Sequence, residues 1–180
     1  MSSIPRSARH VRTSASLGVV LLFATASPVA AQTTTATITI EGGALSISAP
    51  ASAGNLGTRT NTVLAGTVGG PLGQVQVDDA RSAVAGSGWV ASAISTAFTP
   101  PSGPAIAASA VSYATGPIVK VGTATYTAND PAALTGVAAV VTASGITGDN
   151  SATWNPTIEV TVPGGMAAGV YAATITHSVV

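Results

Sequence analysis

The sequence predicts an all-β protein, an antiparallel β-sandwich with immunoglobulin-like or Greek-key connections. After residue 31, apolar and polar residues alternate with a period of two, and Thr and Val dominate these runs. Segments rich in Gly, Pro, Asn and Asp separate the runs, and no run shows helical periodicity. About nine short strands at this spacing are typical of a two-sheet sandwich.

The N-terminal residues predict a secretory signal peptide. A basic start precedes the apolar stretch LGVVLLFATASPVA, and Val29 and Ala31 are the small residues that signal peptidase requires. Cleavage is expected between Ala31 and Gln32. Residues 1–31 would then be removed, leaving 32–180 as one exported domain of 180 − 31 = 149 residues. The alternative, a short membrane anchor, requires the helix to continue through SPVAAQ, which breaks it.

Composition excludes several kinds of partner for the mature chain. Hydrophobic residues make up 46% of the sequence, yet no apolar run after residue 31 approaches the roughly 20 residues of a membrane span. Three cations and six acids remain, a formal charge of 3 − 6 = −3, so no basic surface for nucleic acid or an anionic membrane is expected. The chain has no Cys, so a packed core must supply its stability.

The expected strands follow from the alternating runs. Residues 35–40 and 44–48 flank the sequence EGG and predict a hairpin. Residues 49–70 are expected to form a long loop or an irregular edge strand, and 145–151 a turn. The Ala-rich stretch 131–145 favours helix by composition, but Pro131 and Gly136 favour a break. The other expected strands are 74–79, 88–95, 106–115, 118–128, 136–144, 157–162 and 170–180, the last two forming a final hairpin.

Alternation places Val75, Val77 and Asp79 on one face of their strand and Asp78 on the other. Arg81 returns to the face of Asp79. Because a buried carboxylate requires a partner, we expect a partly buried Asp79–Arg81 salt bridge with a structural role. Asp78 points away, so the two neighbouring acids do not predict a catalytic pair.

The aromatic side chains are few, and each should contribute a large share of the buried apolar area in a core of small residues. Trp89, Phe98, Tyr113, Tyr126, Trp154 and Tyr171 are the six aromatics of the mature chain. Trp154, just ahead of Pro156 and an alternating run, is expected to be a core anchor. Trp89 follows the sequence GSG and is the better candidate for an exposed ligand-binding platform, with Trp154 the second.

His177 alternates with Tyr171, Ile175 and Val179, which places it on the more apolar face of the last strand as a structural residue. It is the only histidine after residue 31, so neither a zinc site nor another metal site is predicted. The sequence contains no G-x-S-x-G elbow and no glycine-rich phosphate loop. We therefore predict no catalytic residues, no metal and no cofactor.

Two stretches carry a resemblance to a known family. The run QVQVDDARSAVAGSGWVASAISTAFT (74–99) and the later ATWNPTIEVTVPGGMAAGVYAATITHSVV (152–180) resemble the WxL-domain group of exported Gram-positive surface proteins, especially high-GC members. The resemblance implies a β-sandwich held non-covalently at the cell surface through peptidoglycan. Its Trp-x-Leu motifs would fall at Trp89 and Trp154, where Ala91 and Pro156 stand in place of leucine.

These observations leave three hypotheses for function. The first is a non-enzymatic exported surface protein that binds wall polymer, peptidoglycan above all, or other surface proteins. The second is an adhesion or assembly subunit that docks by β-strand addition through its Thr-rich N-terminal strand. The third is an exported hydrolase that combines His177 with a serine and an aspartate.

Overall fold

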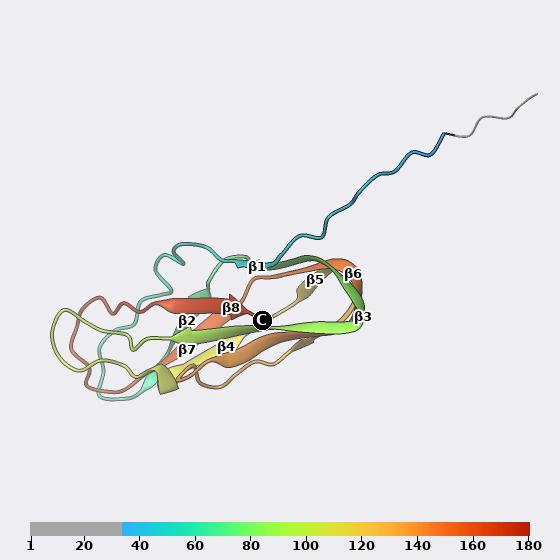
Figure 1. Cartoon of the computed structure of the whole chain (residues 1–180). Coiled ribbons are helices and arrows are strands. Elements are labelled where there is room, and N and C mark those ends of the chain that lie inside the picture. The colour runs from blue at the N-terminus through green and yellow to red at the C-terminus, as the bar shows by residue number, and fades with distance from the viewer. Residues whose placement is uncertain (1–33) are drawn as a thin grey trace, which may run out of the picture. The chain divides into compact units, whose positions relative to one another are not determined.

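The computed structural model describes residues 34–180, so the predicted signal peptide, 1–31, lies outside the described part (Figure 1). Residues 40–180 form one compact unit that contains every described strand. The elements are β1 (Leu45–Ser48), β2 (Gly66–Pro71), β3 (Val75–Ser95), the short 3-10 helix η1 (Ala108–Ala110), β4 (Val111–Ala114), β5 (Ile118–Ala128), β6 (Ala138–Trp154), β7 (Thr157–Val162) and β8 (Ile175–Val179).

The strands form two antiparallel sheets, which confirms the all-β prediction and is consistent with a β-sandwich. The larger sheet has the order β1-β3-β6-β5, and β8 pairs with β3 as well. The smaller sheet has the order β2-β7-β4. β1 pairs with the first part of β3, around Val77, and β8 with its last part, around Ala93.

The long strands β3 and β6 double back together (Figure 1). Trp89 follows Asp79 by ten positions, and a straight strand would place them about 33 Å apart. Instead the Trp89 indole lies 3.0 Å from Asn150, the residue that pairs with Asp79. The two halves of β3 therefore face each other across the core.

At the bend, β3 contains more residues than β6, and residues of both strands adopt a left-handed backbone conformation. Between the pairs Asp79–Asn150 and Trp89–Ala143, β3 contains 89 − 79 = 10 steps against 150 − 143 = 7 on β6, with shifts of register between them. Gly148 adopts φ +72°, a region that glycine enters without strain. Ser82 also has positive φ, and its backbone N–H donates to the Asp149 carboxylate at 2.9 Å.

Three chain crossings join the two sheets at one level. β2 leads into β3 after Pro71, β6 leads into β7 after Trp154, and β4 leads into β5 after Ala114. In each sheet the strand from the β6–β7 crossing lies in the middle, because Trp154 pairs with Val75 and Ile118 while Thr157 pairs with Pro71 and Ala114. The smaller sheet thus continues the larger one around a corner.

The core lies between the layers and confirms the predicted faces of the first strand. Val75, Val77 and Asp79 are buried, whereas Asp78 is exposed. Five of the six aromatics are buried in this core, and Tyr171 is half-buried against it. The fully buried side chains include Trp154, Tyr113, Leu134, Ile146 and Ile158.

Several predicted elements are wrong. Residues 35–40 form no hairpin with 44–48, because β1 pairs with β3 instead. β7 and β8 form no final hairpin, since they belong to different sheets. Residues 145–151 are not a turn between strands but the bend within β6, and 88–95 is the second half of β3. Of the expected strand 170–180, only Ile175–Val179 is regular.

The bend predicts a matched pair of glycine substitutions. A Cβ atom added at Gly148 or at Gly136 would lie in open space, with no neighbouring atom within 4 Å, but only Gly148 has positive φ. Gly148→Ala should therefore lower the free energy of unfolding by about 1 kcal/mol, whereas Gly136→Ala should leave it unchanged or slightly raise it. Urea denaturation measures both, and equal effects would contradict the role of the left-handed conformation.

Candidate functional site

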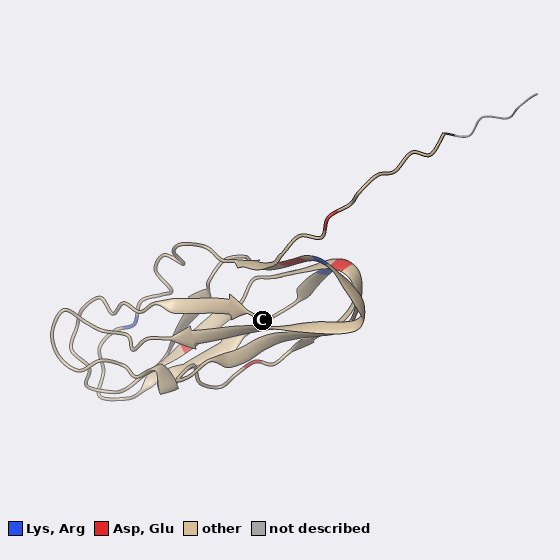
Figure 2. Cartoon of the chain, in the orientation of Figure 1, with Lys and Arg blue, Asp and Glu red and all other residues tan. Residues whose placement is uncertain are grey.

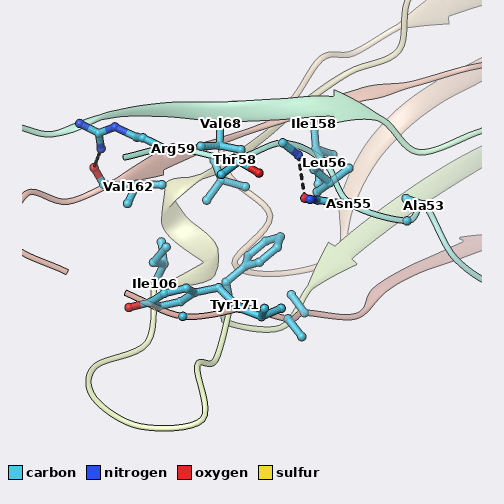
Figure 3. Close-up of a pocket in the computed structure, with 18 of the residues that line it drawn as sticks. Ala53, Asn55, Leu56, Thr58, Arg59, Val68, Ile106, Ile158, Val162 and Tyr171 are labelled. Carbon is cyan, nitrogen blue, oxygen red and sulfur yellow. Dashed lines mark hydrogen bonds between the residues drawn. The ribbon is translucent and has the colours of Figure 1, made fainter. Parts of the chain in front are cut away.

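A groove of about 980 Å³ lies on the side of the domain where two loops approach each other (Figure 3). One wall is the β1–β2 loop, residues 49–62, together with Val68. The other wall is the chain that runs from β7 into β8, residues 163–175. The floor is formed by inward side chains of β7 and by Leu72, Phe98 and Ile106.

The groove is almost free of charge. No Asp or Glu of residues 34–180 lines it, and of its lining residues only Arg59 and His177 can be charged near neutral pH. Figure 2 shows the same scarcity along the strands, where several of the few acidic and basic residues lie near the bend of β3 and β6. A ligand of this groove would therefore meet apolar side chains, uncharged polar side chains and a single guanidinium, that of Arg59.

Arg59 fastens the β1–β2 loop to the end of β7. Its guanidinium donates to the Val162 carbonyl at 3.2 Å and to the Leu64 carbonyl at 2.6 Å, and also to the Thr62 hydroxyl at 3.2 Å. These partners are uncharged, so the cation at the groove rim is held by hydrogen bonds without neutralisation. Figure 3 shows the Arg59–Val162 contact beside Thr58 and Val68.

Tyr171 is the aromatic side chain that the groove presents. Its ring is half-buried, and its hydroxyl donates to the Ala167 carbonyl at 2.9 Å. Tyr171 and Ile106 lie on one side of the hollow, facing Leu56 and Val68 on the other (Figure 3). Its position after the glycine-rich turn PGGMAAG was the signal that could have marked it as a groove residue.

Trp89 and Trp154 are not binding platforms. Each is 2% exposed, so neither ring offers a face to a ligand, and the expectation for Trp89 in particular is wrong. The flexible-looking sequence before Trp89 is the bend of β3, which turns the indole into the core. Both residues act as buried anchors with a hydrogen-bonded indole.

The first anchor belongs to a polar network at the bend. The Asn150 side-chain oxygen accepts from the Trp89 indole at 3.0 Å and from the Tyr126 hydroxyl at 3.1 Å. The Asn150 amide donates to Asp79 at 3.2 Å. Asn150 thereby connects the two facing halves of the bent larger sheet through one buried side chain. Sequence reasoning missed it because its neighbours GDNS suggested a turn.

Asp79 and Arg81 complete this network. The Arg81 guanidinium donates to both oxygens of the Asp79 carboxylate, at 2.8 and 3.0 Å, and also to the Gly88 carbonyl. The hydrogen bonds from Arg81 hold the pKa of Asp79 below its usual value despite burial of the carboxylate. The pair closes the bend, and its buried oxygens are fully satisfied.

The second anchor ties three strands together. The Trp154 indole donates to the Tyr113 hydroxyl at 2.8 Å, and that hydroxyl lies 3.2 Å from the His177 Nε2. The rings of Tyr113 and His177 meet edge-on, with centroids 5.8 Å apart. A neutral His177 that accepts from Tyr113 satisfies every group in this chain of contacts.

Burial determines the protonation of these groups. It lowers the pKa of His177 and raises the pKa of the Tyr113 phenol, so both side chains are neutral at pH 7. His177 contacts no carboxylate or serine hydroxyl in the described hydrogen bonds. The residue proposed for a hydrolytic mechanism is thus engaged in the core contact with Tyr113.

Residues 34–180 contain no group of three His, Cys, Asp or Glu side chains that could hold a metal ion. In the same part of the chain, no helix is long and apolar enough to cross a membrane. Comparisons with family models, with curated proteins and with solved structures found no match to this chain.

The buried ionisable groups predict two separate losses of stability on acidification. Since the pKa of His177 is lowered in the folded state, its contribution is complete above the unfolded value of 6.5 and is lost as the pH falls below it. The pKa of Asp79 is also lowered, so its contribution is lost below 3.8. In urea titrations against pH, His177→Gln should remove the first decline and leave the second.

Asn150→Ala should be among the most destabilising polar substitutions in the domain. It leaves the Trp89 indole N–H buried without its acceptor and the Tyr126 hydroxyl with only the Ser151 carbonyl, at a cost of about 3 kcal/mol in the free energy of unfolding. Ser151→Ala is the matched control, because only the backbone carbonyl of Ser151 takes part in the network. Comparable losses in the two variants would show that Asn150 does not hold the bend.

Proposed function

We propose that this chain is a non-enzymatic exported surface protein that binds peptidoglycan or another surface protein in the groove beside Tyr171. The groove is the observation that carries the proposal. It joins a half-buried aromatic ring to walls without a carboxylate among residues 34–180, and its floor is built on the β7 strand of the sandwich. Such a surface suits recognition by stacking and backbone hydrogen bonds.

The resemblance to WxL-type proteins supports the same location and partner class. Under this proposal the domain is secreted and stays at the cell surface without covalent attachment. The connections between its sheets would be of the Greek-key or immunoglobulin-like kind, since the central strands β3 and β6 are distant in the chain. Peptidoglycan binding would use the groove, because both tryptophans of the expected motifs are buried.

Chemical catalysis finds less support. The only histidine among the described residues is hydrogen-bonded to Tyr113. The Asp79 carboxylate is occupied by its ion pair with Arg81. A hydrolytic site requires a nucleophile, a base and an orienting group within hydrogen-bond reach of one another. Within residues 34–180, the groove lining offers no carboxylate to orient its histidine.

Retention on purified cell walls tests the proposal. We expect the mature chain, residues 32–180, purified from an exporting host to co-sediment with peptidoglycan, and Tyr171→Ala to reduce the bound fraction by about tenfold, the loss typical of an aromatic contact. Val119→Ala is the control, because Val119 is 67% exposed on β5, away from the groove lining. Equal retention of both variants would remove the groove from the proposal, and absence of retention in the wild type would remove peptidoglycan as the partner.

A second candidate function is assembly by β-strand addition. It is favoured by residues 35–40, which alternate like a strand yet pair with nothing in the described structure. Ile38 and Ile40 are 88% and 85% exposed. Exposed apolar side chains on an unpaired strand-like segment are typical of a partner-binding element.

A further inference from the structure

We propose that the free edge of β8 accepts residues 35–40 of a second copy of this chain as an additional antiparallel strand, with the inward side chains of that strand entering the groove. The inference rests on the second function proposed above. It specifies the donor strand, the acceptor edge and the face of the donor that enters the groove. It follows from a comparison of the sheet edges, from the direction of backbone groups on β8, and from the pattern of the donor.

Three of the five edges of the described sheets, those of β4, β2 and β5, are covered or guarded, and a fourth, that of β1, is short, with only 4 residues. On β4, the Tyr113 backbone N–H donates to the Pro131 carbonyl, and β2 lies against the β1–β2 loop, where Gly70 approaches Leu56. β5 is long and open, but Lys120 pairs with the buried Ala152 and so shares its inward face. An inward-pointing charge and the bulge at Gly122 are features that discourage edge pairing.

β8 has neither protection. Its sequence, Ile175–Val179, contains no proline, no bulge and no charged side chain, because His177 is neutral. The inward side chains Ile175, His177 and Val179 are only half-buried, although their partners on β3 are fully buried. At β8 the larger sheet therefore has room for one more strand, on the side where the groove begins.

The backbone N–H and C=O groups of these three residues face the open edge of β8. Val180 and Val90 exchange both backbone hydrogen bonds, and the Thr96 N–H donates to the Thr174 carbonyl. Hydrogen-bonded pairs recur at every second residue of an antiparallel ladder, so Thr176 and Ser178 also bond to β3. Ile175, His177 and Val179 consequently direct their N–H and C=O groups outward, and none has a second backbone partner within residues 34–180.

The donor matches this acceptor in length, charge and pattern. Residues 35–40, TATITI, contain no charge, as the described groove lining contains no carboxylate. Alternation puts Ala36, Ile38 and Ile40 on one face and three threonines on the other. Six residues are enough to pair along the five of β8 and place the isoleucines against the apolar floor.

A complementation experiment tests the proposal in solution, without cell walls. Ile38→Asp disables the donor and leaves the acceptor intact, whereas Val179→Pro removes an outward N–H and leaves the donor intact. We expect the wild-type chain to show a mass that rises with concentration in analytical ultracentrifugation, and each variant alone to remain monomeric. A mixture of the two variants should form a one-to-one dimer that cannot grow further.

Matched controls separate this role from folding. Thr37→Asp, on the opposite face of the donor, and Val179→Ala, which keeps the N–H, should both self-associate within about threefold of the wild type. Self-association that survives Ile38→Asp would overturn the donor. A mixture that stays monomeric while both variants melt like the wild type would overturn the pairing.

A second measurement keeps the proposal testable if Val179→Pro does not fold. A synthetic peptide of residues 34–41 is added to the Ile38→Asp chain, and amide hydrogen exchange is followed residue by residue. The Ile175, His177 and Val179 amides should slow at least about tenfold, while those of Thr176 and Ser178 are already protected by β3. Protection confined to β5 would overturn the choice of edge. Because no wall is present, loss of wall retention leaves this result unaffected.

Discussion

The Asn150 carboxamide is the contact on which the arrangement of this domain depends. One side chain accepts from an indole and a phenol of one layer and donates to a carboxylate of the other. Without it, the Trp89 indole N–H would be buried with no acceptor, and Tyr126 and Asp79 would each lose one of their hydrogen bonds. The contact therefore joins the two halves of the bend and holds Trp89 in the core.

The same logic governs the opposite end of the core, where Tyr113 connects Trp154 to His177. A chain rich in Ala, Val and Thr has few large side chains to fill space between layers. Its aromatics therefore serve twice, as volume in the core and as hydrogen-bonding tethers between strands that are distant in sequence. The chain has no cysteine, so no disulfide adds to these tethers.

Much of the local structure could be predicted from the sequence, but little of the pairing. The strands at 118–128 and 157–162 occur at the predicted residues, and Val75, Val77 and Asp79 share the predicted buried face. Alternation defines faces and carries no information about partners, which is why the two predicted hairpins are absent. The sequence GDNS has the composition of a turn, and the tertiary contact of Asn150 converts it into a bend within one strand.

The candidate site was even less accessible to sequence reasoning. Its walls come from residues 49–62 and 163–175, about a hundred positions apart or more, and almost all of both walls lies outside the regular strands. Tyr171 was recognised only as one aromatic among six. Trp89 attracted attention because it follows GSG, but those glycines serve the geometry of the bend and not the exposure of the ring.

The pairing of β3 with β6 also has a kinetic consequence. The contact between Asp79 and Asn150 closes a loop of 150 − 79 = 71 residues, and β8 completes the edge of β3 only with the last residues of the chain. Closing such loops costs entropy before any native contact compensates it. The domain therefore belongs among topologies that fold in milliseconds to seconds, and an unfinished chain retains little structure until residues beyond 138 are present.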